Sequence, residues 1–115
     1  MPTDRMRRVN EAVREVLSAR IAKGLKDPRI GFVTVTAVET SPDLRHARVY
    51  VSVLGDDPER EATLDGLASS HGVLQAQLAR ELRMKRTPTL EFAYDSSLDH
   101  SMRISELLER EDPDK

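Results

Sequence analysis

Two neighbouring segments in the first half of the chain alternate between apolar and polar residues, and this pattern constrains the fold more than any other feature. Residues 31–39 and residues 45–54 are each long enough for one strand. The five residues between them include Pro42 and Asp43, which favour a short loop. The pattern therefore predicts a β-hairpin with one buried face, formed by Val33, Val35 and Ala37 of the first strand and Ala47, Val49, Val51 and Val53 of the second.

A sheet that is buried on one face needs helices to cover it, and the segment before the hairpin can supply one. Residues 4–24 place apolar side chains at three- and four-residue steps, which is the pattern of an amphipathic helix. Thr3 or Asp4 can cap the start of this helix, and Gly24 marks its expected end.

A second helix is predicted over residues 57–83, where leucines recur on one face. It begins at Asp57-Pro58, where the acid is expected to cap the helix and the proline to occupy the first helical position. Gly72 lies inside this helix, where glycine costs about 1 kcal/mol relative to alanine. A kink or a close backbone contact at Gly72 would account for it.

The rest of the chain adds one strand and one short helix. Residues 89–94 alternate again and predict a third strand, and residues 99–111 predict a final helix followed by a short flexible acidic tail, residues 112–115. The resulting order, α-β-β-α-β-α, predicts an α+β fold in a single domain, residues 1–111, with the helices on one face of the sheet. Because a helix connects the second and third strands, these two are expected to run parallel.

The residue types present argue against an enzyme. The chain has no cysteine, and His46, His71 and His100 are not spaced as metal ligands. It contains neither a phosphate-binding glycine loop nor a serine nucleophile motif. We therefore expect no catalysis, no cofactor and no metal site. With no secretory signal and no apolar span, a soluble, cytoplasmic protein without membrane contact is expected.

Aromatic residues are scarce, which limits how the chain could bind nucleic acid. There are two Phe, two Tyr and no Trp. Phe32, Phe92 and Tyr94 are expected in the core, which leaves Tyr50 as the one surface ring. Stacking of bases on aromatic side chains is therefore not expected to dominate any nucleic-acid contact.

The net charge of −2 conceals a polarised charge distribution. Residues 1–26 carry a net charge of +4 and residues 80–86 a net charge of +3, whereas residues 56–65 carry −4 and residues 106–115 carry −3. A concentrated basic face can bind phosphates whatever the total charge of the chain. The alternative is that these charges are ordinary solvated helix faces.

An ordered set of short sequence matches resembles bacterial ribosome-binding factor A over nearly the full chain. It comprises Arg8-Val9, Asp27-Pro28-Arg29, residues 33–38 (VTVTAV), Ser41-Pro42-Asp43-Leu44, Ala47, residues 49–52 (VYVS), Arg83, Pro88, Leu90, Phe92, residues 94–98 (YDSSL) and Met102-Arg103-Ile104. The resemblance implies a type II KH-like domain. It also implies a monomeric assembly factor that binds the free small (30S) ribosomal subunit and its 16S rRNA. Such a factor supports late maturation, 5′-end processing and growth in the cold, with an assembly GTPase as a further partner.

The resemblance also gives a meaning to Gly72. KH domains clamp single-stranded nucleic acid with a GxxG loop, which this chain lacks. The family is similar in having an Ala-x-Gly kink between two helices, and the corresponding residues here are Ser70, His71 and Gly72. The Ser70 hydroxyl is expected to bond back to the preceding turn and sharpen the bend. Two interpretations stay open, a hinge that lies against rRNA and a glycine needed for close packing. A second departure, Ser101 in place of a common glycine, affects only the local turn.

The rRNA-binding residues are predicted from the basic segments, with phosphate contact and shape recognition as their role. They are Arg80, Arg83, Lys85 and Arg86 after the kink, Arg5, Arg7 and Arg8 on the first helix, and Arg45 and Arg48 at the hairpin. The main alternative is a protein-interaction module that docks through its acidic surface. A small hydrolase that uses unrecognised carboxylates is a third hypothesis, disfavoured by the absence of a recognisable acid pair or nucleophile.

Overall fold

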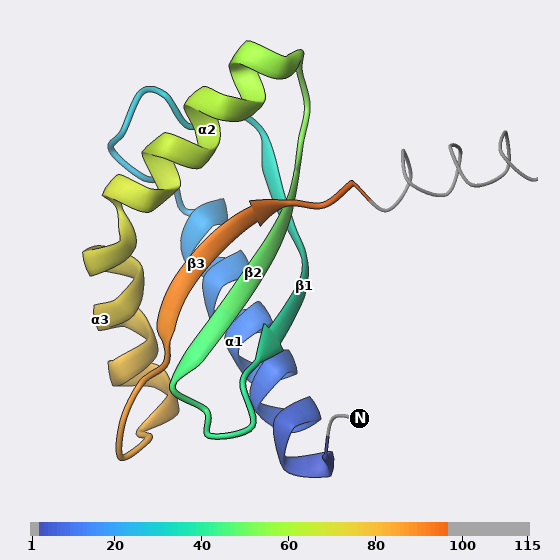
Figure 1. Ribbon diagram of the computed structural model, residues 1–115. Coiled ribbons are helices and arrows are strands. Elements are labelled where there is room, and N and C mark those ends of the chain that lie inside the picture. Colours follow the sequence, from blue (N-terminus) through green and yellow to red (C-terminus); the bar gives the residue numbers. More distant parts are fainter. Residues whose placement is uncertain (1–2, 97–115) are drawn as a thin grey trace, which may run out of the picture.

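The computed structural model describes residues 3–96, and these form the mixed α+β arrangement that the sequence predicts (Figure 1). The elements in chain order are α1 (Asp4–Ala22), β1 (Val33–Thr40), β2 (His46–Val53), α2 (Asp57–Ser69), α3 (His71–Leu82) and β3 (Thr89–Tyr94). The final helix predicted for residues 99–111, the tail 112–115 and Ser101 lie outside the described residues.

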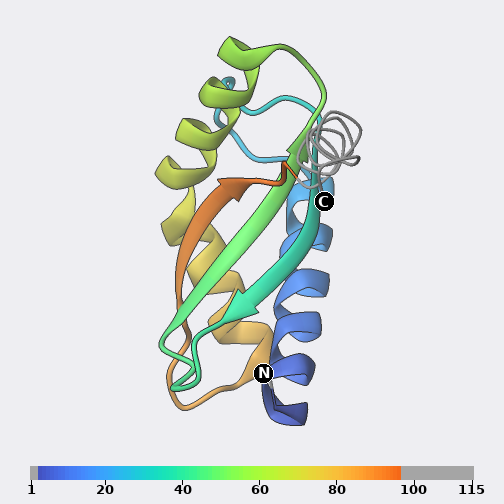
Figure 2. The same ribbon diagram turned by 45° about the vertical axis from the view of Figure 1, so that its right-hand side comes forward.

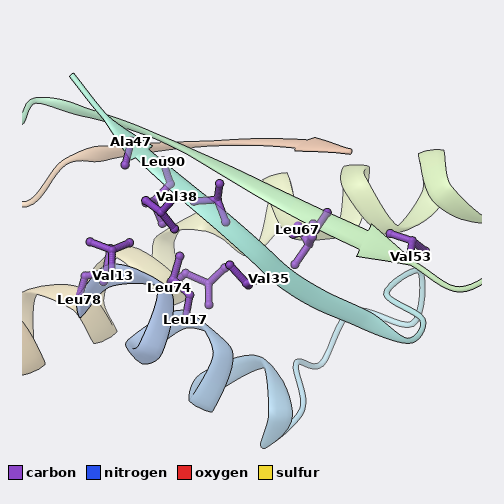
Figure 3. Close-up of a cluster of buried hydrophobic side chains, with 12 residues drawn as sticks. Val13, Leu17, Val35, Val38, Ala47, Val53, Leu67, Leu74, Leu78 and Leu90 are labelled. Carbon is purple, nitrogen blue, oxygen red and sulfur yellow. The ribbon is translucent and has the colours of Figure 1, made fainter. Parts of the chain in front are cut away.

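The three strands form one sheet in the order β1-β2-β3. β1 and β2 pair antiparallel as the predicted hairpin, and β2 and β3 pair parallel, so the expected crossover is confirmed. The helices pack against one face of this sheet, and the core side chains fill the layer between them (Figure 3). The other face presents polar side chains, among them Thr34, Glu39, Arg48 and Glu91.

In β1, the third residue that faces the core is not the one predicted from the sequence. Ala37 is exposed, whereas Val38 is buried. A bulge lies between Val35, which pairs with Val51, and Ala37, which pairs with Tyr50, so Thr36 is an extra residue in β1. Because side chains alternate with a period of two, one extra residue moves every later side chain to the opposite face.

The core consists of aliphatic side chains from all six elements. Seven of them are fully buried, at 0% exposure: Val13, Leu17, Val49, Val51, Leu67, Leu74 and Leu78. Phe92 and Tyr94 are partly buried and pack against this cluster. The prediction of Phe32 in the core is wrong, since this residue is 81% exposed. Val33 and Val35 face the helices. Because successive side chains of an extended chain point to opposite faces, the Phe32 side chain points away from the helices.

The segment predicted as the second helix differs from the prediction in its capping residue, and it is interrupted before its predicted end. Its cap is Asp56, one residue earlier than expected: Asp56 accepts a hydrogen bond from the backbone N–H of Glu59, and the Glu59 side chain accepts one from the backbone N–H of Asp56. This reciprocal pair satisfies two N–H groups that a helix start leaves free. The helix then ends at Ser69, and α3 begins at His71.

The break between α2 and α3 confirms the predicted kink but not its predicted cause. Ser70 has a φ of −90° and a ψ of 5°, and its side chain makes no capping hydrogen bond. The contact with the preceding turn comes from His71 instead, whose Nδ1 lies 2.9 Å from the Ala68 carbonyl oxygen. Among the described residues, a Cβ on Gly72 would meet no atom within 4 Å, so the close-packing interpretation of Gly72 is wrong.

The loop between α1 and β1 rests on one face of α2. The Thr63 hydroxyl accepts a hydrogen bond from the Gly31 N–H at 3.2 Å, and the Arg29 guanidinium donates one to the Ser69 hydroxyl at 2.8 Å. Between them, Gly66 lies so close to the loop that an added Cβ would stand 2.7 Å from Ile30 Cγ1. The absence of a side chain at Gly66 therefore allows the loop and helix to touch.

Asp27 stabilises this loop through hydrogen bonds and makes the free energy of unfolding depend on pH in the acid range. Side-chain and backbone hydrogen bonds from Arg29 lower the pKa of Asp27 from 3.8 to about 2. A depressed native pKa stabilises the fold above pH 3.8, and this stabilisation is lost as the pH falls through about 2. Between these values, the free energy of unfolding is expected to fall more steeply for the parent than for Asp27→Asn. Urea unfolding at a series of pH values measures both, and equal slopes would contradict the assignment.

Candidate nucleic-acid interface

Three segments that are distant in sequence meet at one end of the molecule. The start of α1, the loop between β1 and β2, and the loop between α3 and β3 lie together there (Figures 1 and 2). They do so because α1 runs away from this end while α3, packed against α1, runs toward it. We call this the basic end, since each of the three segments brings arginine or lysine to it.

The three segments border an open hollow of about 580 Å³, which we call the basic hollow. Its walls carry four of the predicted site residues, which sequence separation alone could not place together: Arg5, Arg45, Lys85 and Arg86. All four are exposed. Pro42, Asp43, Leu44 and Met84 complete the lining. The hollow thus combines a cationic rim with apolar wall segments and one carboxylate.

The loops around the hollow are held in defined conformations. The Thr89 N–H donates to the Arg45 carbonyl at 2.8 Å, which ties the two loops together. The Gln75 side-chain amide donates to the Thr87 hydroxyl at 3.1 Å and to the Pro88 carbonyl, which fixes the second loop to α3. The cations are therefore presented on a fixed backbone.

Both non-glycine residues with positive φ among the described residues lie in these two loops. They are Leu44, with a φ of 60°, and Arg83, with a φ of 49°. Leu44 is also buried, at 8% exposure. Arg83 is the left-handed C-cap that ends α3, a common way for a helix to stop. Left-handed backbone is less favourable for a residue with a large side chain such as Leu44.

Asp43 organises the hairpin loop. Its Oδ1 accepts a hydrogen bond from the Ser41 hydroxyl at 2.6 Å and another from the Arg45 N–H at 3.0 Å. These bonds, together with the nearby Arg45 and His46 charges, lower the pKa of the Asp43 carboxyl. The carboxylate therefore stays ionised at neutral pH and can only accept hydrogen bonds.

The other predicted cations fall into two groups. Arg8, Arg80 and Arg83 are exposed near the basic end and form no ion pair with the described residues. Arg7 is paired with Asp4 on its own helix. Arg48 lies on the open face of the sheet, paired with Glu91 at 2.9 Å. Glu39 flanks it on the other neighbouring strand, so this arginine is locally neutralised and stands apart from the basic hollow.

The acidic residues of the 56–65 segment lie at the opposite end of the molecule, where α2 begins (Figure 1). The predicted charge separation is therefore a spatial one for the start of α1 and residues 80–86 against residues 56–65. Arg20, Lys23 and Lys26 lie toward the far end of α1 instead, and residues 106–115 lie outside the described residues. Within residues 3–96, no group of three or more His, Asp or Glu side chains is placed to hold a metal ion. None of the helices in that range combines the length and apolar character needed to cross a bilayer.

The strand order, the parallel β2–β3 pair and the helix pair broken at Ser70 define a KH-like α+β domain. The chain belongs to the ribosome-binding factor A family, because the family model described as Ribosome-binding factor A matches residues 5–108. The relative from Geobacter sulfurreducens is 44% identical over 112 residues, 97% of this chain and 95% of the relative. The one from Anaeromyxobacter dehalogenans is 51% identical over 106 residues, 91% of this chain and 77% of the relative. Both are described as ribosome-binding factor A.

Solved structures support the same assignment. The crystal structure of ribosome-binding factor A from Thermus thermophilus has a TM-score of 0.69 at 34% identity, covering 77% of this chain and 93% of that one. The solution structure of a Thermotoga maritima protein described as a putative ribosome binding factor A has a TM-score of 0.71 at 34% identity, covering 81% and 89%. A Thermus thermophilus homology structure, described as fitted into a cryo-EM map of a 30S complex, has a TM-score of 0.60 at 32% identity, covering 84% and 97%.

Proposed function

We propose that this chain binds the free 30S subunit through 16S rRNA and supports late maturation of that subunit, including 5′-end processing and growth in the cold. The observation that carries this proposal is the basic hollow, where Arg5, Arg45, Lys85 and Arg86 converge from three segments. The Thermus thermophilus relative described as fitted into a 30S complex supports the choice of partner. Such a role is non-catalytic and cytoplasmic, and we propose that the chain acts as a monomer.

Phosphate contact is the mode of binding that the basic end favours. Its cations are exposed, and no aromatic ring lines the basic hollow within the described part of the chain. Salt-sensitive attraction of arginine and lysine to phosphates supplies most of the affinity in such interfaces, whereas stacking needs exposed rings. We therefore expect recognition of rRNA shape and charge rather than of an extended base sequence.

The kink extends the proposed interface along α3. Gly72 is exposed, has room for a side chain and does not lie in the left-handed region, so the fold itself does not require glycine there. α3 is 12 residues long and spans about 18 Å from the kink to the basic end. We propose that rRNA lies against Ser70, His71 and Gly72 at one end of α3 and on the cations at the other.

Two further elements of the proposal concern protein partners. We propose an assembly GTPase as a further partner, as the resemblance implies. The alternative function, a protein-interaction module that docks through the acidic end, has the cluster around Asp56 and Asp57 as its surface. A pull-down of protein partners that survives nuclease treatment would favour this alternative.

Sedimentation with purified free 30S subunits tests the proposed function. With about four to six phosphate contacts, the affinity is expected to fall roughly 50- to 1,000-fold between about 50 and about 200 mM monovalent salt. Joined ribosomes should retain much less protein than free 30S subunits under the same conditions. A chain that stays at the top of the gradient at low salt, with free subunits present, would overturn the proposal.

A further inference from the structure

We propose that the basic hollow receives one unpaired nucleotide of single-stranded RNA, with its phosphates on the cationic rim and a base amino group on Asp43. This inference rests on the proposed function and specifies which form of RNA the basic end takes. It predicts that a base carrying an exocyclic amine, such as cytosine, is preferred to uracil.

The size of the hollow suits a small organic group. At about 580 Å³ it falls in the range of cavities that hold drug-sized ligands, roughly 300–1,000 Å³. A flat basic patch would bind phosphates equally well without such a recess. The recess therefore has room for a base as well as for the RNA backbone.

The shape of the hollow favours a single strand over a duplex. In an RNA duplex the bases are stacked and paired inside, and proteins reach mainly the phosphates and 2′-hydroxyls on its outer surface. Unpaired nucleotides, by contrast, can turn a base outward into a recess and expose its Watson–Crick edge. A recess between two fixed loops is suited to the second arrangement.

The apolar walls provide contacts for a base and its ribose. Pro42 and Leu44 come from the hairpin loop, and Met84 comes from the loop after α3. A methionine side chain adapts readily to flat and irregular ligands. The guanidinium planes of Arg45 and Arg86 can stack on a base while still attracting its phosphates.

Asp43 can orient the base by accepting a hydrogen bond from it. Its Oδ1 accepts hydrogen bonds from Ser41 and Arg45, whereas its Oδ2 forms an exposed ion pair with Arg45 Nε at 3.9 Å and accepts no hydrogen bond from the described residues. A carboxylate repels phosphate, so the phosphates are expected on the side of Arg5, Lys85 and Arg86. Because this ion pair is too long for a hydrogen bond, Oδ2 can still accept one from the amino group of cytosine, whereas uracil would present a second acceptor to it.

Binding of short labelled RNAs to the full chain tests the inference, using fluorescence anisotropy at low salt. The probes are oligocytidine and oligouridine of about ten nucleotides and a duplex of the same length. We expect oligocytidine to bind about five- to tenfold more tightly than oligouridine, and the duplex to bind most weakly per phosphate. Equal affinity for the two single strands, or stronger binding of the duplex, would overturn the inference.

Asp43→Asn supplies the matching variant. Asparagine keeps an oxygen for Ser41 and Arg45 but offers an amide N–H to uracil, so the preference for cytosine is expected to shrink to less than about twofold. Glu91→Gln, an exposed carboxylate on the open face of the sheet, is the control and should keep the preference. A preference that survives Asp43→Asn would remove Asp43 from the site. Normal salt-dependent 30S binding without any cytosine preference would refute this inference and leave the proposed function standing.

Discussion

Reversal of two charges at the basic end, Lys85→Glu together with Arg86→Glu, is expected to weaken binding to free 30S subunits by about a hundredfold or more. Each hydrogen bond to a charged partner contributes about 1.5–3 kcal/mol, and each 1.4 kcal/mol corresponds to a tenfold change in affinity. Both residues are exposed and form no ion pair with the described residues, so the loss is expected to be specific to binding. Sedimentation or anisotropy with purified subunits measures it.

A matched control separates local contact from general electrostatic repulsion. Lys23→Glu together with Lys26→Glu changes the net charge equally, but these exposed residues lie beyond the far end of α1. The control pair is expected to lose less than about tenfold in affinity, through long-range electrostatics alone. Thermal melts should show that both double variants remain folded. Equal losses for the two pairs would show that only the total charge matters.

Alanine at two glycines is expected to change stability in opposite directions. Gly66→Ala places a methyl group 2.7 Å from Ile30 Cγ1, and the resulting overpacking is expected to lower the free energy of unfolding by about 1–2 kcal/mol after the gain in helix propensity. Gly72→Ala meets no atom within 4 Å among the described residues, so it is expected to raise that free energy by up to about 1 kcal/mol. Urea unfolding measures both.

The same two variants test the proposed role of the kink. If rRNA lies against Gly72, the more stable Gly72→Ala protein should bind 30S subunits several-fold more weakly, because its methyl group stands where the RNA approaches. Gly66 is buried under the 27–30 loop, so folded Gly66→Ala protein should bind as the parent does. Unchanged 30S affinity of Gly72→Ala would place the kink outside the interface.

Local patterns in the sequence predict most of the fold. The hairpin, the parallel third strand and the kink follow from periodicity, turn residues and a glycine within a helix. The departures arise where a single residue changes the register. The bulge at Thr36 turns the Ala37 side chain to the open face of the sheet. Phe32 directly precedes the inward-facing Val33, so its side chain points outward and is exposed. Neither residue differs in type from a core residue, so composition alone cannot identify them.

The sequence predicts which residues belong to the candidate site, but not where in the fold they come together. Segment charges select Arg5, Lys85 and Arg86, and Arg45 is added as a hairpin candidate; their convergence depends on how α1 and α3 pack. Arg48 is predicted from the same hairpin as Arg45, yet strand pairing places it between Glu39 and Glu91. Counting charges along the sequence also could not identify the other lining residues of the basic hollow, among them Asp43, Leu44 and Met84. The positive φ of Leu44 becomes visible only in the folded chain.

The salt dependence of 30S binding by the parent and by Lys85→Gln with Arg86→Gln tests the central claim most directly. Neutral substitutions remove two cations without adding repulsion. If both contact rRNA phosphates, the slope of log affinity against log salt concentration should become shallower by about 1.4–1.8. Lys23→Gln with Lys26→Gln should leave the parent slope nearly unchanged. A parental slope in the Lys85→Gln with Arg86→Gln variant would contradict the claim that the basic end binds rRNA.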